Sequence, residues 1–251
     1  MKIVRVLLSL LTLFAASATC AQEEDARALI QRALDSLPNT TMKATIELTS
    51  SRGWTRTLDV YGKRIDDAMV SYIEVTGPQD VKDTRFLFFE RISSPDEQHM
   101  YIPMVKRAIQ IADATRKQAF LGSDFFVSDL VAPELDAYDY KFVGDDEVLG
   151  RKCRLIEATP KRPDIEVYSK TIGCLDTTDW VVLRTQLFDK KGELLKVSTV
   201  KQLDKIDGIW TPLVQEMENV QEKTTSTITI KEIKYNIELP NDIFSRARLL
   251  R

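Results

Sequence analysis

The chain has 251 residues, 43% of them hydrophobic, and its 35 Lys and Arg against 38 Asp and Glu give a net charge of −3. This balance argues against a nucleic-acid partner, because binding to phosphates requires a basic face. The length fits one large β domain with a substantial core.

The first 21 residues have the features of a secretory signal peptide. Lys2 and Arg5 precede an apolar run at residues 6–16, which is too short to span a bilayer, and small residues follow as far as Ala21. We expect cleavage after Ala21. The mature chain, residues 22–251, then has 33 basic residues against 38 acidic ones and a net charge of about −5.

The mature N-terminus predicts one amphipathic helix, at residues 23–37. Pro38 ends this segment, because proline cannot continue a helix. We expect its apolar stripe to pack against a sheet, either to complete a core or to cover a cavity. The stripe consists of Ala26, Leu29, Ile30, Ala33, Leu34 and Leu37.

Beyond this helix the apolar residues recur with a period of two, which is typical of half-buried β-strands. Turn signals such as Gly77-Pro78 and Asp207-Gly208 separate the strands at short spacing. The pattern predicts an antiparallel meander in a single domain, residues 22–251. The predicted strands are 42–49, 54–61, 69–75, 85–89, 105–111, 152–159, 165–171, 181–188, 195–203 and 225–233.

The periodicity leaves three architectures open: a sandwich, a closed barrel, or an open and strongly curved sheet filled by helices. The strand at residues 85–89, with the sequence RFLFF, is apolar on both faces, so both faces need cover. Such a strand lies in the middle of a packed core or lines a pocket on one side. The residues alone allow either outcome.

The cysteines indicate an exported fold with one bridge. After cleavage only Cys153 and Cys174 remain, and such a pair in an oxidising compartment is usually a structural disulfide. Pairing of strands 152–159 and 165–171 predicts that Cys153 lies opposite Cys174. A redox or metal pair is the alternative, but no CxxC or histidine cluster accompanies it. Acylation of Cys20 in a lipoprotein is a further alternative, which the residues before Cys20 match poorly.

No catalytic centre is expected. His99 is the single histidine, and no GxSxG motif supplies the nucleophile that a histidine triad requires. A zinc site would need two or three further ligands, and glycine-rich phosphate loops are absent from the sequence. Acidic pairs at residues 66–67 and 145–146 lie at predicted turns, although a glycosidase that uses carboxylates alone remains open. We expect no enzyme activity, no metal and no cofactor.

The segment from residue 101 to 130, YIPMVKRAIQIADATRKQAFLGSDFFVSDL, resembles the LolA-like group of outer-membrane lipoprotein-sorting proteins. The shared patterns are YxPxxxRxxxI and FxGSDF. The likeness continues with a strand at residues 138–140 and the start of a strand at 150–153. It ends in the closing LPNDIFS at 239–245, where Asn241 departs from the LPD of the family. The resemblance implies a mainly β (α+β) fold, in which a strongly curved antiparallel sheet forms an incomplete β-barrel with helices against its concave face.

The same resemblance implies a periplasmic carrier with an apolar cavity. The expected cavity or lid residues are Phe86, Phe88, Met100, Ile102, Phe120, Phe125 and Phe126, and the expected rim residues are Arg107 and Arg116. The alternative for the FLGSDFF element is a helix cap, made by Ser123 or Asp124, with ordinary core aromatics. The alternative for the basic residues is a solvated hairpin surface.

Three functions follow from this resemblance. The first is a monomeric carrier that shields the acyl chains of a lipoprotein or another lipid in its cavity. The second is an accessory protein that exchanges lipid with an inner-membrane transporter or an outer-membrane acceptor. The third is a sensor or interaction module of the same fold, which binds a partner through its hollow or its free sheet edges.

Overall fold

The computed structural model describes residues 25–66, 68–91, 96–111 and 117–250. The predicted signal peptide and Arg116 lie outside these residues. No helix within the described ranges has the length and apolar character needed to cross a membrane.

Thirteen strands form one antiparallel sheet in the described part of the chain, and two α-helices accompany them. The helices are α1 (Ala26–Asp35) and α2 (Arg246–Leu249), and the short 3-10 helices are η1 (Pro103–Val105), η3 (Phe120–Gly122), η4 (Val127–Leu130), η5 (Leu135–Ala137) and η6 (Asn241–Phe244). The strands are β1 (Met42–Ser50), β2 (Trp54–Ile65), β3 (Ala68–Gly77), β4 (Arg85–Arg91), β5 (Glu97–Ile102), β6 (Arg107–Gln110), β7 (Tyr138–Val148), β8 (Arg151–Pro160), β9 (Lys170–Asp176), β10 (Val181–Phe188), β11 (Leu194–Ile206), β12 (Ile209–Asn219) and β13 (Thr224–Tyr235).

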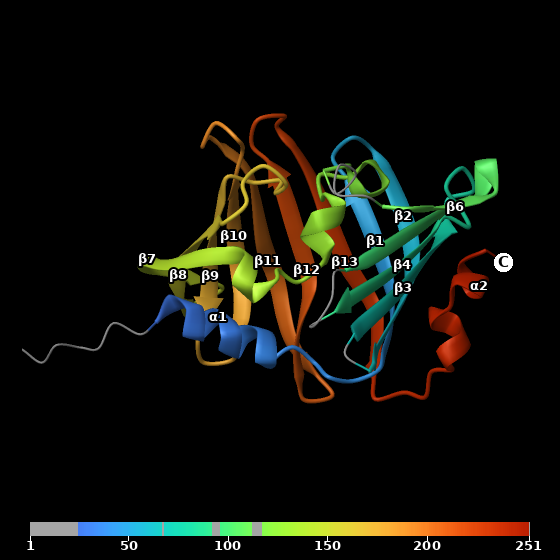
Figure 1. Ribbon diagram of the computed structural model, residues 1–251, viewed down its shortest axis with the longest axis horizontal. Coiled ribbons are helices and arrows are strands. Elements are labelled where there is room, and N and C mark those ends of the chain that lie inside the picture. Colours follow the sequence, from blue (N-terminus) through green and yellow to red (C-terminus); the bar gives the residue numbers. More distant parts are fainter. Residues whose placement is uncertain (1–24, 67, 92–95, 112–116, 251) are drawn as a thin grey trace, which may run out of the picture.

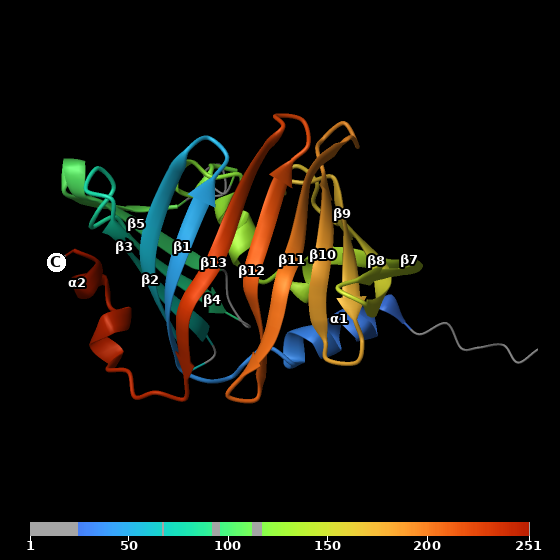
Figure 2. The same ribbon diagram turned by 180° about the vertical axis from the view of Figure 1, so that it is seen from behind.

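The sheet is an open meander whose middle is made by the first and last strands. β1 pairs with β13, and hairpins extend from this pair in both directions, so that β6 and β7 lie at the two ends of the sheet. Residues 117–137, which precede β7, and helix α1 lie in front of the strands in Figure 1 and behind them in Figure 2. The expected fold, a mainly β structure with a curved antiparallel sheet that does not close into a barrel, is confirmed.

Helix α1 covers the β7–β9 end of the sheet. Its N-cap Asp25 accepts a hydrogen bond from the backbone N–H of Arg27 at 3.0 Å, which satisfies one of the free donors of the first turn. Leu29 is fully buried against Ile156 and Leu175. Ala26, Leu29, Ile30 and Ala33 of the predicted stripe pack in this cluster. The prediction was wrong for Leu37, which lies beyond the shorter helix and is 52% exposed.

Strands β3 and β4 are apolar on both faces, and other parts of the chain cover each face. Successive side chains of a strand point to opposite faces. Phe86 and Phe88 join the cluster on the inner face of the sheet, whereas Leu87 joins a second cluster with Phe244 and Leu249 from the C-terminal segment. The RFLFF sequence reflects this double burial, and α2 covers the outer rather than the inner face.

Two strand predictions need correction. Residues 165–169 belong to the connection between β8 and β9, so β9 begins at Lys170 and not at residue 165. The structure also contains β12, which no clean alternation indicated. The predicted strand 105–111 is in fact the end of η1 followed by the short edge strand β6.

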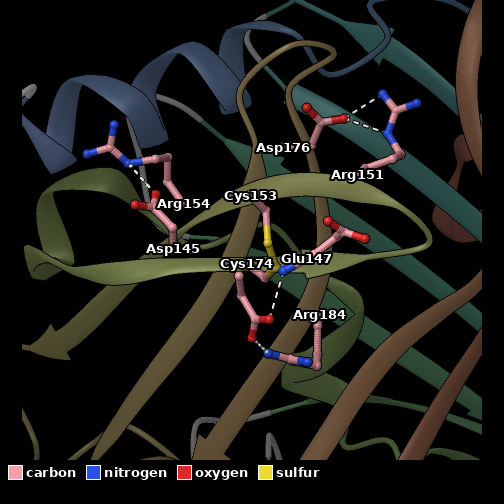
Figure 3. Close-up of a disulfide and its surroundings, with 9 residues drawn as sticks. Asp145, Glu147, Arg151, Cys153, Arg154, Cys174, Asp176 and Arg184 are labelled. Atoms are coloured by element: carbon pink, nitrogen blue, oxygen red, sulfur yellow. Dashed lines mark hydrogen bonds and ion pairs between the residues drawn. A yellow bond between two sulfur atoms is a disulfide. The ribbon is translucent and has the colours of Figure 1, made fainter.

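The predicted disulfide between Cys153 and Cys174 is present, with a Cα–Cα distance of 5.3 Å. The predicted register was wrong by two residues, because Cys174 pairs directly with Leu155 and reaches Cys153 diagonally. Ion pairs surround the bridge, including Arg154 with Asp145 and Arg184 with Asp146 (Figure 3). The acidic pair at 145–146, on β7, therefore forms ion pairs with arginines of β8 and β10.

Candidate functional site

Residues 119–132, which we call the covering segment, fill the inner face of the sheet. Phe120 and Phe125 are 4% and 2% exposed, and with Val127 they pack in one cluster with side chains from β1, β2, β3, β4, β10 and β12. The Phe86 and Phe120 rings lie 5.0 Å apart between centroids. Strands from both arms of the sheet contribute to this cluster, as expected on the inside of a curved sheet.

The covering segment folds back on itself as a tight loop. The backbone N–H of Phe120 donates to the Phe125 carbonyl at 2.7 Å, and Ala119 forms an isolated bridge with Phe126. Gly122 has a φ of +75°, a conformation that glycine adopts without strain. The loop directs Phe120 and Phe125 to the same cluster. Gly122 therefore makes possible the turn that buries both rings.

The capping role predicted for Ser123 or Asp124 falls to another residue. Asp129 accepts a hydrogen bond from the backbone N–H of Phe126 at 2.7 Å and so caps η4. Ser123 instead bonds within the loop, donating to the Phe120 carbonyl at 2.7 Å. The Asp124 carboxylate faces β13.

Asp124 attaches the covering segment to β13. Its carboxylate accepts hydrogen bonds from the hydroxyls of Ser226 and Thr224, both at 2.6 Å, and its side chain is fully buried. Arg52, from the turn between β1 and β2, lies 3.3 Å from the same carboxylate. Two hydroxyls and a guanidinium compensate a buried charge that would otherwise be costly.

Asp129 attaches the segment further along the sheet, to β11. One of its oxygens accepts a hydrogen bond from the Tyr168 hydroxyl at 2.7 Å, and the other lies 3.7 Å from Nζ of Lys196. Burial raises the pKa of the Asp129 carboxyl, and burial together with Asp129 raises the pKa of Tyr168. Burial also lowers the pKa of Lys196 to about 8. This group joins the covering segment to β11 and to the connection before β9.

Two further polar contacts attach the segment to β2 and β4. The Arg56 guanidinium donates to the Leu121 carbonyl, and the Glu90 carboxylate accepts from the backbone N–H of Ala132 at 3.0 Å. Burial raises the pKa of Glu90 from 4.5 to about 7. Polar contacts therefore lie around the apolar centre of the covering segment and hold it to several strands.

The structure brings four of the predicted cavity residues together: Phe86, Phe88, Phe120 and Phe125. Met100 is half-buried beside them, and Phe126 stacks on Tyr168 with its ring centroid 6.1 Å away. Ile102 is half-buried at the end of β5. Of the predicted rim residues, Arg107 is exposed on the edge strand β6, and Arg116 lies outside the described residues.

Sequence reasoning missed Glu90, Tyr168 and Lys196. Lys196 carries a weak signal, because it stands two residues before Ser198 and four before Val200, both buried on the same strand. A lysine in phase with buried positions suggests a buried charge with a partner. Glu90 likewise follows Phe86 and Phe88 with a period of two. Tyr168 gave no such signal.

Comparisons with known proteins agree with this fold. A family model described only as an uncharacterized protein matches residues 68–251. No curated protein matches the chain. A DUF1329 family protein from Desulfovibrio piger has 25% identity and a TM-score of 0.83, and the match covers 89% of this chain and 97% of that one.

Two further solved structures are similar. A putative outer-membrane lipoprotein-sorting protein domain from Vibrio parahaemolyticus has 23% identity and a TM-score of 0.83, over 90% of this chain and 98% of that one. A LolA superfamily protein from Nitrosomonas europaea has 16% identity and a TM-score of 0.69, over 89% and 99%. The chain therefore belongs to this family of uncharacterized proteins, and its fold is that of the LolA-like outer-membrane lipoprotein-sorting proteins that its motifs resemble.

Proposed function

We propose that this protein is a periplasmic carrier of acylated lipoproteins or lipids, and that acyl chains bind on the inner face of the sheet where the covering segment lies. The observation that carries this proposal is the nature of that segment. Its apolar side chains fill the hollow as a cargo chain would, and it is attached to the sheet by hydrogen bonds and ion pairs. Such a segment can leave the hollow without unfolding the strands.

The expected free energy of binding an acyl chain is small enough for a carrier, which must release its cargo. Each buried methylene of an acyl chain contributes roughly 0.8 kcal/mol, so a long chain in an empty apolar pocket would be held very tightly. Here the cargo must first displace Phe120 and Phe125, which already bury apolar area in the same place. The net free energy of binding is therefore the gain from burying the acyl chain minus the loss from exposing Phe120 and Phe125. Binding is then weak enough for the cargo to be passed on.

We also propose that the chain reaches the periplasm by means of the leader at residues 1–21 and that residues 22–251 act as one domain. Its task in this proposal is binding, without catalysis or a cofactor. An inner-membrane transporter and an outer-membrane acceptor are the partners that a lipoprotein carrier requires. Both the leader and the partners follow from the sequence and the family resemblance.

A second candidate is an interaction module. β6 is fully exposed at one end of the sheet, and an end strand offers free backbone groups to an added strand from a partner. Such a protein would bind a peptide without lipid. The test of the carrier also distinguishes this candidate.

The test is native mass spectrometry, followed by organic extraction, of residues 22–251 purified from a periplasm without detergent. A carrier is expected to retain an acylated species or to take up added lipid. Phe88→Asp is expected to abolish this uptake, because it places a charge on the inner face. Leu87→Asp is the matched control, since Leu87 is equally buried on the outer face of the same strand.

Both variants require a check of folding by circular dichroism. If neither folds, the wild-type result decides alone. A wild-type protein that carries no lipid and takes up none would contradict the carrier. A peptide partner captured without lipid would favour the interaction module instead.

A further inference from the structure

A cavity of about 220 Å³ lies between the covering segment and the ends of β11 and β12. Gly122, Ser123 and Phe126 line it on one side and Leu195, Lys196 and Asn219 on the other. Arg52 and Glu222 complete its wall from the turns of the β1–β2 and β12–β13 hairpins. The cavity thus lies at the mouth of the hollow, beside the loop that carries Phe120 and Phe125.

Lys196 is the unusual residue of this cavity. Its side chain is fully buried, and its Nζ has no hydrogen-bond acceptor among the described residues. The ammonium lies over the ring of Phe126, 2.9 Å from its centroid, and its distance of 3.7 Å from Asp129 exceeds that of a hydrogen bond. A buried donor without an acceptor is costly, so the cavity is suited to a molecule that brings one.

The carboxylates around the cavity already have cationic or hydrogen-bonding partners. Arg52 lies 3.3 Å from Asp124 and 2.6 Å from Glu222, and both oxygens of Asp129 accept hydrogen bonds from other groups. Three carboxylates thus stand against the two cations Arg52 and Lys196. This balance does not favour a further anion. The chemistry that remains is a neutral acceptor oxygen.

We propose that this cavity binds the ester or amide carbonyl oxygens at the head of an acyl chain, with Lys196 as the hydrogen-bond donor. The inference rests on the proposed carrier function and names the part of the cargo that is recognised outside the hollow. An acyl chain on the inner face would leave the hollow at its mouth. Its first carbonyl would then lie beside Lys196, and the hydrocarbon chain would replace Phe120 and Phe125.

The experiment compares two lipids that differ in one carbonyl: palmitoyl lysophosphatidylcholine, an ester, and its hexadecyl ether analogue. Binding to residues 22–251 is measured below the micelle concentration of each lipid by tryptophan fluorescence and calorimetry. We expect the ester to bind about tenfold more tightly than the ether, a difference of ~1.4 kcal/mol. The preference is expected to vanish in Lys196→Met through weaker binding of the ester alone.

Lys201→Met is the matched control on the same strand, because Lys201 is exposed and pairs with Glu216 at 3.0 Å. This variant is expected to keep the full preference. Equal binding of ester and ether by the wild type would overturn the role of Lys196 and leave the carrier function intact. A preference that persists in Lys196→Met would also overturn it. A failure to bind either lipid would contradict the carrier function itself.

Discussion

Asp124 and Ser226 exchange two hydrogen bonds between the covering segment and β13. The backbone N–H of Asp124 donates to the Ser226 hydroxyl oxygen at 2.9 Å, and that hydroxyl donates to the Asp124 carboxylate at 2.6 Å. Both residues are buried. This reciprocal pair holds the GSD part of the FLGSDFF motif against β13, so these residues attach the covering segment to the sheet.

Ser226→Ala is expected to loosen the covering segment selectively. The change removes both hydrogen bonds and leaves the buried Asp124 with fewer donors, which costs about 1–3 kcal/mol. Amide hydrogen exchange in residues 119–132 is expected to accelerate, while exchange in β8 and β9 stays the same. Thr227→Ala is the control, because Thr227 points to the opposite face of β13. Equal acceleration in both variants would show that Ser226 does not hold the segment.

Glu90→Gln is expected to change the pH dependence of stability. The pKa of Glu90 is raised from 4.5 to about 7, so the folded protein binds a proton there that the unfolded chain releases. The stability associated with this proton is fully present below about pH 4.5 and is lost as the pH rises through about 7. Its size is on the order of 3 kcal/mol, since one unit of pKa corresponds to ~1.4 kcal/mol.

Glutamine stays neutral and keeps an oxygen for the Ala132 N–H, so the variant is expected to gain stability relative to the wild type as the pH rises from about 5 to 8. Urea unfolding at several pH values measures this difference. Glu134→Gln, at an exposed position, is expected to show no such trend. A constant difference between Glu90→Gln and the wild type would mean that folding does not raise the pKa of Glu90.

Removal of the disulfide is expected to lower stability without loss of lipid binding. The bridge closes a loop with a sequence separation of 21 residues, for which a contribution of about 3 kcal/mol is typical. Cys153 and Cys174 pack in a separate cluster with Val148 and Leu183, away from the covering segment. Urea unfolding and lipid uptake of the Cys153→Ala, Cys174→Ala double variant test both statements. A folded double variant that takes up no lipid would show that the bridge supports the binding face.

Alternation predicted most of the strands, but it did not predict β12. In β12, Pro212 and the buried polar residues Thr211 and Asn219 interrupt the pattern, so period two is hidden. Residues 165–169 have strand propensity, but Tyr168 turns away to bond Asp129, and this tertiary contact overrides the local preference. The helix prediction succeeded because an apolar stripe and Pro38 act locally.

In the candidate site, the apolar residues were predicted from the sequence and the polar contacts were not. Phe86, Phe88, Phe120 and Phe125 were predicted because a motif and an apolar strand mark them. The polar contacts were not, because their partners are distant in sequence: Asp124 and Ser226 are 102 residues apart, and Glu90 and Ala132 are 42 apart. Only the curvature of the sheet brings these residues together, and no local pattern encodes it.

The most direct test of the central claim is to locate a bound acyl chain within the protein. The chain has three tryptophans, of which Trp54 packs beside the inner cluster, Trp180 beside α1 and Trp210 beside Arg151. Single-tryptophan variants, with phenylalanine at the other two positions, are titrated with a lipid whose acyl chain carries bromine, a short-range quencher of tryptophan fluorescence. We expect strong quenching of Trp54 and little quenching of Trp210. Bound lipid that leaves Trp54 unquenched would place the acyl chain outside the hollow and contradict binding on the inner face of the sheet.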